Sequence, residues 1–353
     1  MLDFYELLTD TEIMANQSIG IDINEKYTRV VDLSIDNGKI NLSSMGTEST
    51  VPNFFSDDTE KSIDNQSEII AKLCSDLKIV KKNANVVISD SQSFSQVLEF
   101  ARLNEKELLS AVKYQADQFI PMAIDEVDLD IEILKDDKLS KKNTILIVAS
   151  PKKVIDRIEK ALDLAGFSAD SLENELSSFS RLFSETIHPK GTGAYLVVNF
   201  GYTSTSLYLY DAQTYLLLMS RTIKIGLDLF LKELRFNFEL QESKAMEVLK
   251  TLGFEKNTSY DVAGIVSPLM KELITEITKM IIQSKEKYAL PVSKIFTFNY
   301  NCGILSFEKK LTEVLSIPVE SLLLRELLIN NPVSQSFSHD LPSYICSMGA
   351  VLR

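Results

Sequence analysis

Two stretches of the chain repeat one pattern of apolar and polar positions, and each predicts three strands joined by tight turns. In the later stretch, residues 194–226, the run from Tyr195 to Phe200 is almost continuously apolar, which is typical of a strand buried on both faces. The segment from Ser204 to Tyr210 alternates apolar and polar residues, as a strand with one buried face does. A third strand is expected from Tyr215 to Ile225, so the stretch predicts a small antiparallel meander.

The first turn of this meander is built from small and hydroxyl-bearing residues. Gly201 and Tyr202 lead into Thr203 and Ser204, and Gly226 ends the third strand. A turn of this composition directly after a buried strand offers backbone N–H groups and hydroxyls to a phosphate. An ordinary hairpin with polar turn residues is the alternative, and a second copy of the pattern favours the phosphate turn.

The second copy lies near the N-terminus, at residues 18–47. It begins with a short apolar strand that contains Asp22 one residue before its end, and a polar turn from Asn24 to Tyr27 follows. The Asn-Gly sequence in the turn 36–38 is a strong hairpin signal. Asp22 and Asn199 hold equivalent places in the two copies. A duplication of this kind predicts two related α/β domains that face one another.

Composition narrows the classes of function. The 353 residues are 45% hydrophobic and 25% charged, which suits globular domains with sizeable cores. The net charge of -13 disfavours nucleic-acid binding and adsorption to anionic lipid, and favours basic partner segments. Three cysteines without metal-ligand spacing and two histidines in polar segments indicate neither a metal centre nor nucleophilic catalysis. Without a signal peptide or an apolar run of about 20 residues, a cytoplasmic protein is expected.

An inserted α+β module is expected at about residues 85–167. A helix from Asn104 to Ile120 ends before Pro121, and a strand and a returning strand follow it. The first of these strands, 127–133, alternates an apolar face with an acidic face. The acidic face consists of Asp128, Asp130 and Glu132. It is either a solvated face or an electrostatic guide for a basic segment.

The expected division of the chain follows from these patterns. Residues 1–17 form an N-terminal extension, and residues 18–190 form the first half together with the inserted module. Residues 191–341 form the second half, which includes a helical subdomain at about 227–288. A closing helix at 342–353 is expected to pack on the first half.

Four further segments carry weaker signals. Apolar spacing predicts helices over residues 66–78 and 172–188. Residues 50–64 and 330–341 lack a regular period and are expected to be loops. None of the four contains a recognisable catalytic pattern.

Several short segments, taken together in their order and spacing, resemble the PilM family, the actin-like cytoplasmic proteins of type IV pilus assembly. The segments are Gly20 to Ile23, Gln118 to Pro121, Glu126 to Asp130, Val148 to Lys152, Arg221 to Ile223 and Met348 to Arg353. The resemblance covers essentially the whole chain from Ile19 onward. No single segment is specific, but their combination is.

The resemblance implies an α/β fold of the actin-like, FtsA-like and ribonuclease H-like type. This fold is a duplicated core with an inserted small α+β subdomain and a helical subdomain. ATP and magnesium would lie against the two phosphate turns, with the ion held by carboxylates through its waters. The residues implied at this cofactor site are Asp22, Asn24, Lys26, Asn199, Gly201, Tyr202, Thr203, Ser204 and Gly226.

The chain also departs from the family at each nucleotide element. The first turn is rich in Gly and Ser in the family, whereas here Glu25 brings a negative charge toward the phosphates. Asn199 stands where a second acid is usual, and Tyr300 is bulky where glycines normally leave room. ATP and magnesium are therefore expected to bind weakly or not at all, and no catalytic or metal-ligating residue is assigned.

The main partner implied by the resemblance is the N-terminal tail of a PilN-type inner-membrane protein, held in a groove beside the inserted module. The candidate contacts are Phe100, Phe119, Met122, Asp128 and Asp130. Phe100 and Met122 lie near the ends of their elements and are expected to be exposed. The favoured function is a cytoplasmic scaffold of the type IV pilus assembly platform that reaches the inner membrane through its partner. The alternatives are a working ATPase of the actin and heat-shock-chaperone type, or a GspL-like secretion platform protein.

Overall fold

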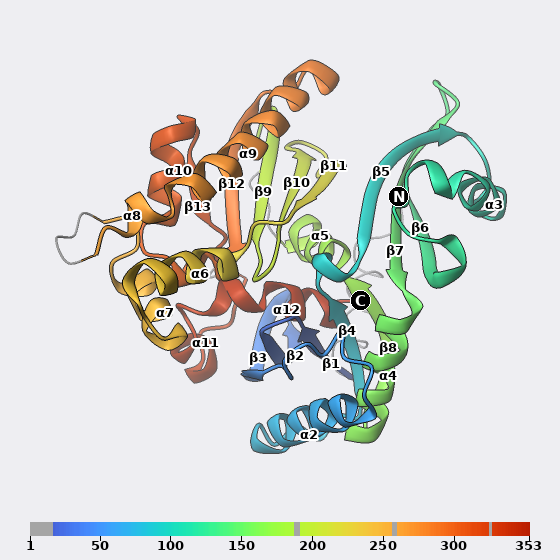
Figure 1. Ribbon diagram of the computed structural model, residues 1–353. Coiled ribbons are helices and arrows are strands. Elements are labelled where there is room, and N and C mark those ends of the chain that lie inside the picture. Colours follow the sequence, from blue (N-terminus) through green and yellow to red (C-terminus); the bar gives the residue numbers. More distant parts are fainter. Residues whose placement is uncertain (1–16, 187–190, 256–259, 325–326) are drawn as a thin grey trace. The chain divides into compact units, whose positions relative to one another are not determined.

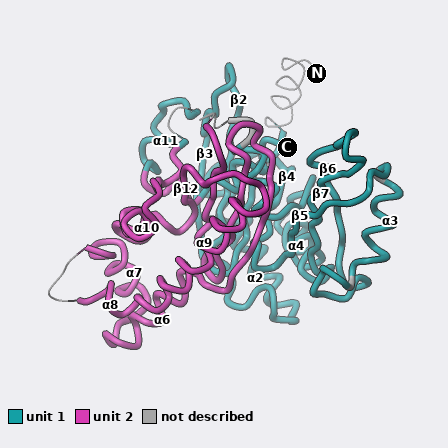
Figure 2. The backbone as a smooth tube through the Cα atoms, turned by 90° about the horizontal axis from the view of Figure 1, so that it is seen from above, with its two compact units in different colours: residues 1–187, 324–338, 344–353 teal, residues 188–323, 339–343 magenta. Residues whose placement is uncertain are grey.

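The computed structural model describes residues 17–186, 191–255, 260–324 and 327–353 (Figure 1). The predicted N-terminal extension lies outside these residues, apart from Gln17. The chain divides into two compact units, shown in different colours in Figure 2. Unit 1 comprises residues 1–187, 324–338 and 344–353, and unit 2 comprises residues 188–323 and 339–343.

Unit 1 is built on a five-stranded sheet of order β3-β2-β1-β4-β8. The strands are β1 (Ser18–Ile23), β2 (Tyr27–Asp36), β3 (Lys39–Ser49), β4 (Asn83–Ile88) and β8 (Ser168–Asn174). β1 is antiparallel to β2 and parallel to β4, and β4 is parallel to β8. The predicted meander of the earlier copy therefore forms one side of this sheet, with β1 at its centre.

Alternation along β1 sends its side chains to two different layers of unit 1. Ile19, Ile21 and Ile23 join the core formed with α2 (Glu60–Asp76) and α4 (Lys152–Ala165). The intervening positions face the other layer, which holds α5 (Glu175–Thr186) and α12 (Ile345–Val351). A Cβ at Gly20 would collide with the Ser347 carbonyl oxygen, so only glycine lets α12 approach β1 this closely.

The inserted module of unit 1 has a three-stranded antiparallel sheet of order β5-β7-β6. Its strands are β5 (Phe94–Ala101), β6 (Val127–Asp137) and β7 (Lys142–Pro151), and α3 (Glu105–Gln115) lies against it. α3 begins with a capping box between Asn104, its N-cap residue, and Glu107. Leu108 and Val112 of α3 pack with the apolar face of β7 to form a core of the module's own.

Unit 2 repeats the topology of the first sheet, with the order β11-β10-β9-β12-β13. The strands are β9 (Ala194–Phe200), β10 (Thr205–Asp211), β11 (Leu217–Ile223), β12 (Val292–Asn299) and β13 (Val319–Ser321). β9 is antiparallel to β10 and parallel to β12, as β1 is to β2 and β4. The helices of this unit are α6 (Leu227–Phe238), α7 (Glu242–Thr251), α8 (Val262–Ile265), α9 (Ser267–Tyr288) and α10 (Phe307–Leu315).

Some predicted boundaries are wrong. The helix expected over residues 172–188 begins only at Glu175, because the preceding residues pair with β4 as strand β8. α2 begins inside the predicted loop 50–64, at Glu60. The predicted loop 330–341 contains α11 (Pro332–Ser336), which starts with Asn331 as its N-cap. In each segment, pairing or capping fixes a structure that periodicity alone does not reveal.

Candidate phosphate turns and partner-binding module

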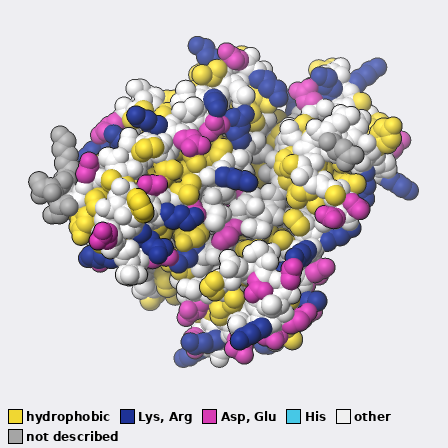
Figure 3. All heavy atoms as spheres, in the orientation of Figure 1, with side chains coloured by type: hydrophobic (Ala, Val, Ile, Leu, Met, Phe, Trp, Pro, Cys, Tyr) yellow, Lys and Arg dark blue, Asp and Glu magenta, His cyan; other side chains and the backbone are white. Residues whose placement is uncertain are grey.

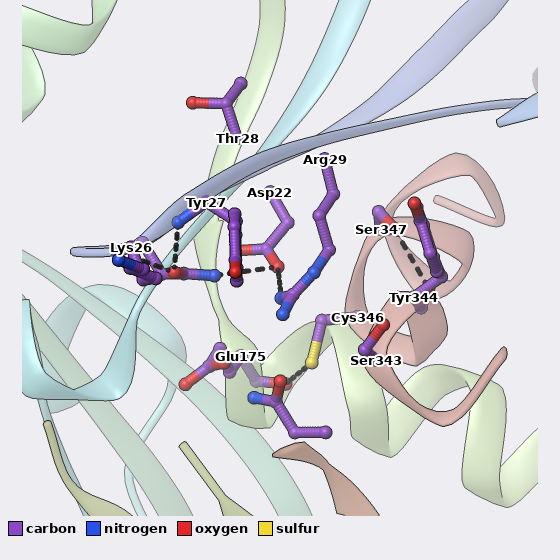
Figure 4. A network of polar contacts seen from close by, with 12 residues as sticks. Asp22, Lys26, Tyr27, Thr28, Arg29, Glu175, Ser343, Tyr344, Cys346 and Ser347 are labelled. Carbon is purple, nitrogen blue, oxygen red and sulfur yellow. Dashed lines mark hydrogen bonds and ion pairs between the residues drawn. The ribbon is translucent and has the colours of Figure 1, made fainter. Parts of the chain in front are cut away.

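The first candidate site lies at the end of β1, where Asp22 faces Arg29 across the β1–β2 pair (Figure 4). An Arg29 guanidinium nitrogen donates to Asp22 Oδ2 at 2.7 Å, and the two residues are only 2% and 1% exposed. The second carboxylate oxygen, Asp22 Oδ1, has no hydrogen-bond partner within the described part of the chain. Burial raises the pKa of Asp22 above its usual value, although the Arg29 charge acts in the opposite direction. The acid that the resemblance places at the cofactor site therefore already has a cation beside it.

Asn24 shapes the turn that follows β1. Its side-chain oxygen accepts hydrogen bonds from the backbone N–H groups of Lys26, at 3.1 Å, and Tyr27, at 2.9 Å. Its own backbone N–H donates to the Tyr27 carbonyl, which closes the turn. The Lys26 ammonium and the Arg29 guanidinium each lie 5.9 Å from the centroid of the Tyr27 ring. The backbone N–H groups of Asn24, Lys26 and Tyr27 are thus all used within the turn itself.

Buried acids surround the Asp22–Arg29 pair. Glu175, the first residue of α5, accepts a hydrogen bond from the Asp90 backbone N–H at 3.0 Å, and both residues are buried. Burial raises the pKa of Glu175 well above its usual value, and the charges of Asp90 and Asp22 add to the shift. Figure 4 shows Cys346 of α12 beside Glu175, and burial likewise raises the pKa of this thiol. Burial in this cluster thus disfavours additional negative charge.

Glu25, at the tip of the same turn, is half-buried rather than solvated. Its carboxylate accepts hydrogen bonds from the Ser91 hydroxyl and, at 2.9 Å, from the Gln92 side-chain amide. Ser91 and Gln92 belong to a short 3-10 turn (Asp90–Gln92) between β4 and β5. The first turn is therefore tied to the segment that leads into the inserted module.

The second candidate site lies at the end of β9, where Asn199 is 1% exposed. Its side-chain amide donates to the Tyr208 hydroxyl at 3.1 Å, and its oxygen accepts from the Asn299 amide at 2.9 Å. Asn199 thereby joins β9 to the strands on either side of it. In unit 2, Asn199 is therefore part of a neutral hydrogen-bond network that crosses three strands.

The turn after β9 is closed on itself and on α6. The Gly201 N–H donates to the Ser204 carbonyl, and the carbonyls of Gly201 and Tyr202 accept from the N–H groups of Leu227 and Asp228. A Cβ at Gly226 would collide with the Tyr202 carbonyl oxygen, so this close approach requires glycine. Two N–H groups from the first turn of α6 are thus used by the protein itself.

The hydroxyl-bearing residues at this turn differ in burial. Thr205 donates to the Ile225 carbonyl at 2.6 Å, and Ser204 is buried, whereas Thr203 is half-buried. The rings of Tyr202 and Tyr300 pack with their centroids 5.9 Å apart. Tyr300, only 6% exposed, fills the space beside the turn as its size predicts.

In the module, the expected exposure of Phe100 and Met122 is wrong. Both are half-buried and pack against the module's own core, as does Phe119. The Phe100 and Phe119 rings meet edge to face with centroids 6.5 Å apart. These side chains therefore extend the core between α3 and the small sheet. Phe100 and Phe119 are half-buried rather than fully buried, and Phe100 lies on β5, at one edge of the module sheet.

Asp128 and Asp130 lie on β6, the opposite edge strand of the module, and both are exposed. Their register partners on β7 are Ser150 and Val148, so they share the face turned away from α3. On the face of the molecule drawn in Figure 3, acidic and basic side chains are interspersed over both units. Asp128 and Asp130 thus form a pair of exposed acids on one face of β6.

Sequence reasoning misses the residues that complete the first site. Arg29 is not among the predicted site residues, although a basic residue on a strand opposite an acid is a signal for a cross-strand pair. Glu175 and Asp90 carry no such signal, because their meeting depends on β8, part of which is predicted as helix. The two turns each lie within one unit, and the module candidates lie together in the module.

The family model described as "Type IV pilus assembly protein PilM" matches residues 20–353. The chain belongs to this family. Among solved structures, a "PilM-PilN type IV pilus biogenesis complex" is similar with a TM-score of 0.81 and 19% identity, over 96% of this chain and 98% of that one. The ethanolamine utilization protein EutJ from Carboxydothermus hydrogenoformans matches with a TM-score of 0.53 and 11% identity, over 95% of this chain and 89% of EutJ.

A further similar structure is a Bacteroides thetaiotaomicron protein with actin-like ATPase fold and unknown function. Its TM-score is 0.50 at 11% identity, over 100% of this chain and 98% of that one. At these identities the structures establish the fold, and the predicted actin-like architecture of this PilM family member is confirmed. Such a fold is compatible with nucleotide and metal binding in general.

Two kinds of feature are absent from the described residues of this PilM family member. No group of three or more His, Cys, Asp and Glu side chains there is arranged to hold a metal ion. None of the helices in that same part of the chain combines the length and apolarity needed to cross a bilayer.

Proposed function

We propose that the chain is a cytoplasmic scaffold of type IV pilus assembly that binds the N-terminal tail of a PilN-type membrane protein. The observation that carries this proposal is the match of the PilM family model to residues 20–353. A similar fold is present in a solved complex of PilM with PilN. The chain would reach the inner membrane through this partner.

The inserted module is the proposed docking site for the tail. β5 is an edge strand, and an extended segment can add to such an edge through its backbone. Phe100, Phe119 and Met122 offer the accessible parts of apolar side chains, while Asp128 and Asp130 add negative charge on the other edge strand. This arrangement favours a tail that combines apolar and basic residues.

The scaffold is proposed to bind magnesium nucleotide weakly or not at all. At the first turn, Arg29 neutralises Asp22, so a divalent ion would have to displace a buried guanidinium. Glu25 places a carboxylate where phosphates would approach. At the second turn, the amide of Asn199 replaces a carboxylate, and two N–H groups of α6 bind turn carbonyls. These features favour a scaffold over an ATPase.

Three measurements test the proposal. Fluorescence anisotropy with a labelled PilN-type tail peptide should show saturable binding, unchanged by magnesium ATP. A double substitution of Asp128 and Asp130 to Asn should slow association at low salt while leaving the thermal midpoint unchanged, because exposed charges contribute little to stability. Robust steady-state ATP hydrolysis that depends on Asp22 would establish the ATPase alternative instead.

A further inference from the structure

The module joins the core sheet of unit 1 through two crossings of very different length. At the second crossing, β7 ends at Pro151 and α4 begins at the next residue. At the first crossing, β4 ends at Ile88 and β5 begins at Phe94. The five residues between them, 89–93, are the hinge segment, and they hold only one short 3-10 turn. Because β5 begins directly after the hinge segment, the contacts of this segment help to fix the position of β5.

Two acids of the core bind the hinge segment from different sides. The Glu25 carboxylate accepts from the side chains of Ser91 and Gln92, and Glu175 accepts from the Asp90 backbone N–H. Asp90 in turn accepts from the Leu176 N–H at 3.4 Å. Three successive hinge residues are therefore held by the first turn and by the start of α5.

The turn that carries Glu25 is itself firmly placed. Asn24 closes it through two side-chain hydrogen bonds, and Lys26 accepts from the Thr50 N–H through its carbonyl at 3.0 Å. The buried Asp22–Arg29 pair joins the two strands on either side of the turn. The hydrogen bonds of Glu25 thus fix the hinge segment relative to the core sheet.

Retaining Glu25 at this place is electrostatically unfavourable. Its charge is among the causes that raise the pKa of both Asp22 and Glu175. A solvated turn residue would avoid this repulsion, whereas Glu25 is half-buried and accepts two hydrogen bonds from one segment. This unfavourable repulsion indicates that the Glu25 carboxylate has a structural role, which a small neutral residue could not fulfil.

We propose that Glu25 is a positioning residue for the inserted module: it fixes the hinge segment, and thereby the orientation of β5 that the tail meets. The chain would hold its docking strand in place with its own phosphate turn. This role rests on the proposed function only for its effect on tail binding, because the effect on the hinge segment is measurable without a partner.

The test compares Glu25→Ala with Glu25→Gln, which keeps an oxygen acceptor, and with Glu68→Ala, an exposed glutamate on α2. Hydrogen–deuterium exchange of full-length protein is followed by mass spectrometry. Loss of hydrogen bonds to a charged acceptor should speed exchange in residues 89–97 of Glu25→Ala by about tenfold or more. Exchange should stay within about threefold of wild type in the other two variants.

Tail affinity is then measured by anisotropy on the same proteins. Glu25→Ala should bind the PilN-type tail peptide about three- to tenfold more weakly, with the thermal midpoint preserved and affinity kept in Glu25→Gln. Unchanged exchange in the hinge segment, a rise of equal size in Glu68→Ala, or a local rise without loss of affinity would overturn the positioning role. If wild type does not bind the tail at all, the proposed partner is refuted, while the exchange comparison still decides whether Glu25 fixes the hinge.

Discussion

Replacing Arg29 with Met tests whether this internal cation neutralises the first turn. Met keeps an unbranched apolar side chain in the buried space but removes the guanidinium that lies 2.7 Å from Asp22. Asp22, at 1% exposure, would then be an uncompensated buried charge. Removing one partner of a buried ion pair costs about 3–5 kcal/mol. For domains of this size, the loss corresponds to a fall in midpoint temperature of about 6–20 °C.

The pH dependence of this variant has a defined sign. The folded-state pKa of Asp22 is already raised by burial, and loss of Arg29 removes an influence that lowers it. A raised folded pKa means that the folded protein binds a proton more tightly than the unfolded chain, so stability rises as the pH falls. Arg29→Met should therefore recover part of its loss in mildly acidic buffer, and wild type should gain less.

The assay needs to report each unit separately. Pulsed hydrogen exchange along a urea series, read by mass spectrometry, follows peptides from β1 and β2 for unit 1 and from β9 for unit 2. The unit 2 midpoint should not move and serves as an internal control. The Asp22→Asn, Arg29→Met double variant should regain about 2 kcal/mol relative to Arg29→Met, because no buried charge remains. A single variant within about 1 kcal/mol of wild type, or a double variant less stable than the single one, would refute the reasoning.

Four other substitutions, one of them a control, have expected outcomes of their own. Glu175→Gln should stabilise unit 1 at neutral pH and make its free energy of unfolding less dependent on pH. The reason is that the raised pKa of Glu175 favours the folded state only as the pH falls, and urea midpoints across a pH series measure this. Gly226→Ala should destabilise unit 2 by about 1–3 kcal/mol because its Cβ would meet the Tyr202 carbonyl oxygen. Gly303→Ala, which has open space around it, should leave the stability unchanged, and the thermal midpoints of the two variants test this. Phe100→Ala should cost about 1–2 kcal/mol through its contact with Phe119, and an unchanged midpoint would place Phe100 outside the module core.

The sequence is sufficient to predict the duplicated core because strong local signals coincide there. The apolar runs at Ile19 to Ile23 and Tyr195 to Phe200, and the hairpin residues after them, predict the strands that form the centre of each sheet. The strand β8 escapes prediction because the segment 168–174 becomes a strand only by pairing with β4. That pairing joins distant parts of the chain, so the local spacing of apolar residues does not reveal it.

The chemistry of the first turn is only partly predictable. The sequence shows that Glu25 is unsuited to a phosphate, but it does not show that this carboxylate binds Ser91 and Gln92. The exposure expected for Phe100 and Met122 fails for a related reason. Position near the end of an element favours exposure, yet a small module must use its terminal side chains to complete its core.

The close packing of α12 on β1 has a consequence for the order of events during synthesis. Gly20 meets the carbonyl of Ser347, and Gly349 meets that of Ser178, so the central strand of unit 1 is covered by residues translated long after it. The β9 to β13 sheet of unit 2 needs only residues that leave the ribosome earlier. Unit 2 can therefore complete its sheet while β1 still awaits its cover, and a released chain truncated after residue 343 should hold a folded unit 2 and a chaperone-accessible, protease-sensitive unit 1.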